Sequence, residues 1–391
     1  MTSLTQPRPD SHSPDRHSPD RRSPGRHSPE PDLREVIEVV IGVDTHTATH
    51  TAAVVCARTG GVLEEITVEA TAVGYQQLVE FAEQHPALRA WAIEGTSSHG
   101  AGLARLLSAT GEVIIELDRP ERARRRHGAK SDALDAVRAA REALARPRWG
   151  SPRTSHAPGA AAHAAERDAL ATLLVARRSA VQAAGDARRQ LIALIVTAPE
   201  HVRARFHVTA SCQAPAVAGR LRHRAGEDVA TATTITVMRS LARRIEALEI
   251  EAAAHQNAMV TIIRGWRPDL LATHGVGPIV AATVLCAWSH PGRVHSDAAF
   301  AMLAGIAPIP ANSGQQQTRW RLNRSGDRRL NQAVHTIVLC RTRHDPRTRD
   351  YIARRTAEGK TPREIRRCLK RYVIRELYRL LEHPEQPATT T

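Results

Sequence analysis

The chain has 391 residues, of which 42% are hydrophobic and 3% are aromatic. A chain of this length can form two or three domains with separate cores. No apolar run approaches the roughly 20 residues that a membrane-spanning helix needs, and the polar, Arg- and Pro-rich start is unlike a signal peptide. We therefore expect a cytoplasmic protein with no membrane partner.

The positive charge of the chain is concentrated near its end. The whole sequence carries a net charge of +15, and residues 319–379 hold 19 Lys and Arg against 6 Asp and Glu, a net charge of +13. Most of these cations are Arg, which contacts phosphate through two parallel hydrogen bonds. The segment therefore predicts a nucleic-acid-binding surface, with a merely solvated basic face as the first alternative and contact with an acidic membrane surface as a weaker one. The five scattered cysteines form no C-x-x-C pair, which disfavours a zinc site or a disulfide framework.

The first part of the chain is a repeat that cannot fold by itself. Residues 12–30 repeat a five-residue unit with Ser-Pro in each copy and no large apolar side chain. Such a segment has nothing to bury, so we expect a disordered tail over residues 1–34, and a second short one over residues 383–391.

Residues 35–150 alternate between strand and helix patterns. A β-branched run at 37–43 is typical of a strand buried on both faces. Further strands are predicted at 51–57, 62–69, 90–93 and 113–117, and helices at 75–83, 101–108 and 131–145. This order indicates an α/β, mixed-sheet domain of the ribonuclease H-like (RuvC-like) type, although another short α/β family could share it.

The remainder of the chain reads as helical. Apolar residues recur at helical intervals across 160–196 and 230–263, which predicts a long coiled-coil hairpin over residues 160–263 with an irregular connection at 199–226. Such a hairpin would hold subunits together as a dimer or tetramer, or it would space two domains, although Ala-rich helices also pack in ordinary bundles. Residues 264–382 form a third, mainly helical domain that contains the basic segment.

Four carboxylates fall where a metal site would need them. Asp44 ends the first buried strand, Glu94 follows a later one, and Asp132 and Asp135 share one face of a helix. Each acid alone reads as an ordinary turn or helix-start residue. Together they could hold two Mg²⁺ or Mn²⁺ ions roughly 3.5–4 Å apart, which is a common way to activate a phosphodiester.

Several other residues are candidates for contacts to the nucleic-acid backbone. Gly275 and Gly277 lie between two predicted helices, in a turn like that of a helix-hairpin-helix motif, where backbone amides can hold a phosphate. Glycines that only permit a tight turn are the alternative. The candidate cations are Arg124, Arg125, Arg126, Lys130, Arg319, Arg321, Arg324, Arg328 and Arg329.

Ordered motifs in both halves resemble one family. They are Gly42-Val43-Asp44-Thr45-His46, Glu94-Gly95-Thr96, Asp118-Arg119-Pro120, 130–136 (KSDALDA), 299–301 (AFA), Gly305-Ile306-Ala307-Pro308, Ser313-Gly314, 321–324 (RLNR) and 367–372 (RCLKRY). Over residues 36–381 the chain resembles the DEDD-type insertion-sequence transposases. These are RNA-guided bridge recombinases with a RuvC-like N-terminal domain and a C-terminal transposase domain.

The resemblance implies a specific chemistry. The four carboxylates would bind Mg²⁺, and Ser313 would be the nucleophile that becomes joined to the cut DNA end. A structured guide RNA would pair with donor and target DNA, so that base pairing and not the protein selects the sequence. Without the family, Ser313-Gly314 would be read as a turn dipeptide. Thr47 and Asn312 depart from the family pattern, in which Lys and Ser are common.

Two other functions remain open from the sequence. A hydrolytic nuclease, such as a junction resolvase, would use the same acids with water as the nucleophile. A non-enzymatic nucleic-acid scaffold would use only the hairpin and the basic segment, but clustered carboxylates would then oppose phosphate binding.

Overall fold

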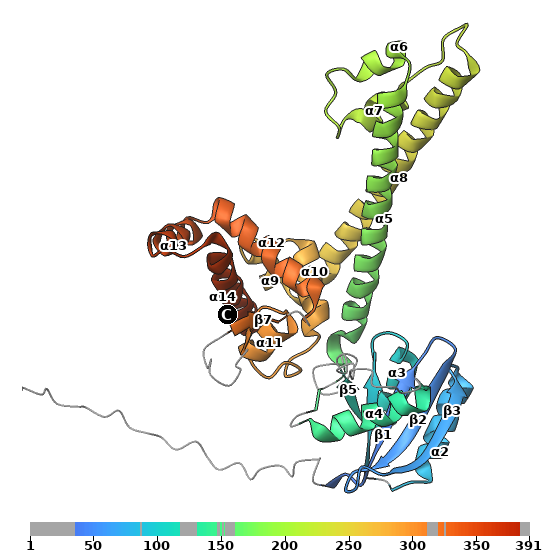
Figure 1. The fold of residues 1–391 in the computed structure, drawn as a ribbon, viewed down its shortest axis with the longest axis vertical. Helices are drawn as coiled ribbons and strands as arrows, with labels where there is room; N and C mark the ends of the chain where they lie inside the picture. The colour runs from blue at the N-terminus through green and yellow to red at the C-terminus, as the bar shows by residue number, and fades with distance from the viewer. Residues whose placement is uncertain are drawn as a thin grey trace, which may run out of the picture.

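The computed structural model describes residues 36–86, 88–117, 131–146, 149–150, 152, 161–310, 320–323 and 326–383. The predicted tail over residues 1–34 lies outside these residues, as does the end of the chain beyond His383. Figure 1 shows a sheet with its helices, a long helical hairpin that rises from it, and a helical C-terminal part beside the base of the hairpin.

The N-terminal part is built on a mixed five-stranded sheet of order β3-β2-β1-β4-β5. The first three strands are antiparallel, and β4 and β5 run parallel to β1. The sheet therefore agrees with the α/β, mixed-sheet domain expected from the sequence. Its strands are β1 (Val39–Thr45), β2 (Thr49–Cys56), β3 (Val62–Glu69), β4 (Arg89–Glu94) and β5 (Val113–Leu117).

Helices cover both faces of this sheet. On one face α2 (Ala72–Glu83) and α3 (Ala101–Ala109) pack on alternate residues of β1, including Ile41 and Val43. On the other face α4 (Asp132–Ala145) packs against Val40 and its neighbours. Both faces of β1 are thus buried, which explains its almost continuous β-branched sequence.

Two long antiparallel helices form the hairpin (Figure 1), α5 (Ala164–Thr197) and α8 (Val229–Trp266). Near the tip, Leu191 of α5 and Ile245 of α8 belong to one apolar core. The expected irregular connection is partly helical, because residues between Pro199 and Leu221 fold back and bury Val202, Phe206 and other side chains in that core. Its elements are α6 (Glu200–Arg203), η2 (Ala204–Phe206) and α7 (Ala214–Gly219), and η1 (Ala161–His163) precedes α5.

The C-terminal part surrounds one buried helix. Almost every side of α10 is buried, and the core around it extends to Leu170, Met259 and Ile263 at the base of the hairpin. None of the helices in the described residues is both long and apolar enough to span a membrane. The elements are α9 (Pro268–Ala272), α10 (Pro278–Trp288), α11 (Asp297–Leu303), β6 (Pro308–Pro310), β7 (Trp320–Leu322), α12 (Arg328–His344), α13 (Pro346–Ala357) and α14 (Pro362–Glu382).

A buried polar contact joins the C-terminal part to the sheet. Arg293, between α10 and α11, lies 3.4 Å from Glu116 of β5, and each side chain is only 5% exposed. Next to them, His290 Nε2 lies 3.4 Å from the carbonyl oxygen of Pro152. Charged side chains are rarely buried unless they are paired, so this contact ties the two parts together at β5.

Candidate metal centre and nucleic-acid interface

The carboxyl ends of β1 and β4 carry two of the predicted acids. Val43 of β1 is opposite Ile93 of β4 in the parallel register, so the next residues, Asp44 and Glu94, lie beside one another at the same edge. The hydroxyl of Thr45 donates a hydrogen bond of 3.0 Å to the backbone oxygen of Glu94, which holds the two strand ends together. Asp44 is half-buried and Glu94 is exposed.

Helix α4 brings the third acid to this edge. Ser131 caps the helix by accepting a hydrogen bond from the Leu134 amide. The helix lies very close to β1, because a Cβ on Gly42 would be 2.0 Å from the backbone oxygen of Ala136. A glycine is therefore required here, and the close packing places Asp132, in the first turn of α4, near Asp44.

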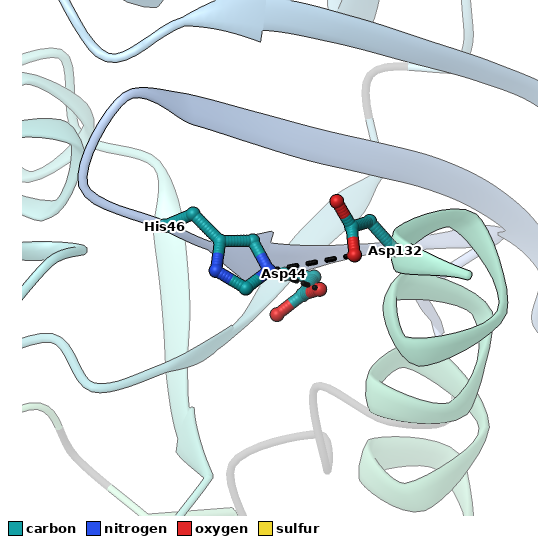
Figure 2. Close-up of side chains that lie close together, drawn as sticks. All are labelled: Asp44, His46 and Asp132. Atoms are coloured by element: carbon teal, nitrogen blue, oxygen red, sulfur yellow. Dashed lines mark ion pairs between the residues drawn. The ribbon is translucent and has the colours of Figure 1, made fainter. Parts of the chain in front are cut away.

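One ring nitrogen of His46 faces both of these acids (Figure 2). Its Nε2 is 3.2 Å from Asp44 Oδ2 and 3.5 Å from Asp132 Oδ1. Asp44, His46 and Asp132 offer three ligand atoms that all lie within 4.8 Å of one another. His46 was not among the site residues expected from the sequence. The available signal was its spacing two residues after Asp44, since alternate residues of an extended chain face the same side.

The electrostatics of Asp44 fit a bound cation. Burial raises the pKa of its carboxyl above the ordinary value, and the charges of Asp132 and Asp135 raise it further, while His46 opposes them. Asp44 Oδ2 and His46 Nε2 are both buried and lie 3.2 Å apart as an ion pair. A divalent cation bound here would be held by these two atoms together with Asp132 Oδ1.

The other two predicted acids do not belong to this group of three ligand atoms. Asp135 is one turn further along α4 and forms an ion pair of 2.7 Å with Arg138. Glu94 is adjacent at the strand edge but is not among the three. The group combines one imidazole nitrogen with two carboxylates, whereas the four acids expected from the sequence would offer oxygen ligands alone.

The turn with the two glycines lies between α9 and α10. Gly275 has φ +84°, a conformation that favours glycine, and a Cβ there would be 3.3 Å from Ile337. Gly277 caps the start of α10, and a Cβ on it would meet no atom within 4 Å. The role of this turn in holding a phosphate stays a prediction.

Some of the predicted cations lie in the part of the chain that the structure describes, and others lie outside it. Arg328 and Arg329 are exposed in the first turn of α12, and Arg321 lies in β7. The predicted nucleophile Ser313 and several cations lie outside the described residues. These cations are Arg124, Arg125, Arg126, Lys130, Arg319 and Arg324.

Known protein families match both halves of the chain. Residues 41–199, which include the Asp44–His46–Asp132 group, match a transposase model of the DEDD type named for IS110. Residues 268–353 match the Transposase IS116/IS110/IS902 family. The chain is also 32% identical over 161 residues to the "Insertion element IS900 uncharacterized 42 kDa protein" of Mycobacterium paratuberculosis. That alignment covers 40% of this chain and 40% of that protein.

Proposed function

We propose that this chain, a member of the IS110 family of DEDD transposases, cuts and rejoins DNA strands when an insertion sequence moves. The observation that carries the proposal is the Asp44–His46–Asp132 group at the sheet edge, within the DEDD match. Three ligand atoms within 4.8 Å of one another suit a divalent cation, and DNA cleavage is chemistry that such a cation supports.

The residues of the site would share the work as follows. Asp44, His46 and Asp132 would hold the cation, and Glu94 and Asp135 would hold a second ion or its water ligands. When bound, Mg²⁺ or Mn²⁺ would offset the charge of the phosphodiester and favour the ionised form of an attacking hydroxyl. The cations of the C-terminal segment would hold the DNA backbone in place.

The family resemblance assigns the attack to Ser313, which lies in sequence between β6 and β7. Its oxygen would form a bond to phosphorus while the bond from phosphorus to one DNA oxygen breaks. The serine proton would pass to solvent, and the departing DNA oxygen would leave as a hydroxyl. A second DNA hydroxyl would later displace the serine, so the energy of the phosphodiester would be kept.

Three finer features belong to the same proposal. A guide RNA would select donor and target, and the protein would read the backbone of the paired strands. The α5–α8 hairpin would act as a coiled coil that joins subunits into a dimer or tetramer. The turn at Gly275 and Gly277 would hold a phosphate as a helix-hairpin-helix motif does.

Trapping the DNA adduct tests this proposal. The wild-type chain, incubated with Mn²⁺, the guide RNA and DNA that carries the ends of its own element, should give a covalent protein–DNA band on a denaturing gel. Ser313→Ala should remove that band, and so should Asp44→Asn. Ser325→Ala is the matched control, because Ser325 also precedes a glycine, and it should retain the adduct.

The same gel separates the other two functions. In a hydrolytic nuclease, the described site would act with water, so Ser313→Ala would still cut DNA in the presence of metal and no variant would form an adduct. If neither the wild type nor any variant changes the DNA with Mn²⁺ present, the chain is a binding scaffold and both enzyme functions are wrong.

A further inference from the structure

A cavity of about 320 Å³ opens between α12 and α14 in the C-terminal part. The two helices lie side by side (Figure 1) and contribute one wall each. The opposite side is formed by Gly305 and Ile306 after α11 and by Asn323 after β7. The polar side chains of the two helices that line it are Asn331, His335, Arg363, Arg366, Arg367 and Lys370.

The lining contains five basic side chains and no acid. Elsewhere in the basic segment, four arginines have carboxylate partners. Arg341 pairs with Glu376, Arg355 with Glu358, and both Arg371 and Arg375 with Asp297. Within the described part of the chain, by contrast, no carboxylate lies within ion-pairing distance of the four cavity cations on α14. Glu364, one turn before Arg367, is engaged by Thr361 at the start of the helix.

Lys370 is held at the cavity by a neutral group. Its Nζ donates a hydrogen bond of 2.7 Å to Asn331 Oδ1, and Asn331 Nδ2 in turn donates one of 2.8 Å to the Ala304 carbonyl. These two hydrogen bonds fix the ammonium group of Lys370 but leave its charge uncompensated, and the group has two further N–H donors. Burial lowers the pKa of Lys370, and the neighbouring Arg366 lowers it further.

His335 lacks a partner at the same place. Its Nδ1 is buried and has no hydrogen-bond partner among the residues that the structure describes. Burial lowers the pKa of the imidazole, and the charges of Lys370 and Arg366 act in the same direction. An anion in the cavity would accept hydrogen bonds from these groups and offset their mutual repulsion.

We propose that this cavity is a binding site for a single phosphodiester group of a nucleic-acid backbone, with Lys370 and Arg366 as its main ligands. The site rests on the proposed function for its ligand, since a transposase must hold DNA. Arg363 and Arg367, which are exposed at its edge, would contact the flanking phosphates. Because Asn323 follows β7 directly, a backbone held here would pass beside the β6–β7 pair, between whose strands Ser313 falls in sequence.

Binding measurements with paired variants test the site. The variant Arg366→Gln/Lys370→Gln removes two charges at the cavity, and the control Arg347→Gln/Arg349→Gln removes two exposed charges from α13. For the full chain and a short DNA duplex, the cavity variant should raise Kd about tenfold. It should also reduce the slope of log Kd against log salt by about one, the value for one lost phosphate contact. The control should change Kd by less than about threefold.

The same titration with a short RNA hairpin identifies the source of the phosphate. If the cavity variant loses more affinity than the control for DNA alone, for RNA alone or for both, the result supports the site and identifies the nucleic acid that it holds. Equal losses for the cavity and control variants would overturn it, because the segment would then act only as a diffuse positive surface. Arg363→Gln/Arg366→Gln, which leaves the Lys370–Asn331 bond intact, should give a similar loss if the first variant unfolds.

Two further readouts separate this site from the proposed function. Inorganic phosphate should shift the ring ¹⁵N resonances of His335 in the wild type and not in the cavity variant. If that shift is absent while the Ser313-dependent adduct still forms, the cavity proposal fails and the transposase proposal stands. If the shift is present and no adduct forms, the cavity proposal stands and the transposase proposal fails.

Discussion

The imidazole of His46 is the residue on which the metal proposal depends most. It contributes the only nitrogen to the ligand group found in the described residues. His46→Ala should therefore weaken Mn²⁺ binding by at least about tenfold, with little change in folding, because His46 is half-exposed. Free Mn²⁺ measured by electron paramagnetic resonance gives the affinity. His99→Ala, an exposed histidine of the same part of the chain, should bind as the wild type does. Equal affinity in both variants would contradict the assignment.

At the scale of residues, two of the acids expected from the sequence belong to this candidate site. Asp44 and Asp132 were expected from their places at a strand end and in a helix start, and the structure brings them to the same edge. His46 was missed because its spacing two residues after Asp44 does not by itself indicate a metal ligand. Only the approach of α4 shows that Nε2 lies close to two acids. That approach depends on packing at Gly42, which no local sequence rule reveals.

The packing of α4 on β1 leads to a prediction at the scale of elements. In Gly42→Ala the new Cβ would overlap the backbone of Ala136 and Ala140, so α4 must move outward. We expect a loss of about 1–3 kcal/mol in the free energy of unfolding and weaker Mn²⁺ binding as Asp132 moves away. Gly265→Ala is the control, because its Cβ would lie in open space on α8. This substitution should raise the free energy of unfolding by up to about 1 kcal/mol. Unchanged stability in Gly42→Ala would show that α4 is not fixed there.

A carboxylate joins α11 to α14 and makes their packing depend on pH. Hydrogen bonding from Arg375, and the charges of Arg371 and Arg375, hold the pKa of Asp297 below its ordinary value of 3.8. The folded state therefore binds this proton more weakly than the unfolded state does. The stabilisation is present above the ordinary pKa and is lost as the pH falls through the lowered one.

Asp297→Asn should consequently cost about 1 kcal/mol at pH 7 and nothing at a pH below the lowered pKa, where the wild-type carboxyl is also neutral. Denaturant unfolding at both pH values measures this difference. Asp350→Asn on α13, whose carboxylate forms no ion pair with a described residue, should show no such dependence. A constant cost for Asp297→Asn at both pH values would mean that the effect is not electrostatic.

Element types were more predictable than their ends. The strands at 62–69 and 113–117 were placed as the structure has them, because their β-branched runs are bounded by turn residues. The first strand begins at Val39 and not at residue 37, since Ile37 is buried in the core without joining the ladder. The connection at 199–226 was expected to be irregular. Its short helices form because they cover the tip of the hairpin, a tertiary effect that periodicity does not record. The coiled-coil character of the hairpin stays a prediction.

At the scale of the whole molecule, the Glu116–Arg293 pair should control how the sheet and the C-terminal part are coupled. Glu116→Gln or Arg293→Gln removes one charge of this buried pair, so each should cost about 3–5 kcal/mol in unfolding free energy. In the double variant both charges of the pair are removed, and its cost should be well below the sum of the two. A double-mutant cycle in denaturant measures this coupling. Strictly additive costs would show that the two side chains do not interact.

The hairpin also shows where the length of this chain is free to vary. Helix α8 alone has 38 residues, about 57 Å of helix, yet α5 starts and α8 ends at the same base. Insertions or deletions of equal size in both helices would move the tip and leave the distance from Asp44 to β6 unchanged. Selection for a longer or shorter nucleic-acid partner could therefore act on the hairpin as on an adjustable spacer, while the chemical groups at its base stay in place.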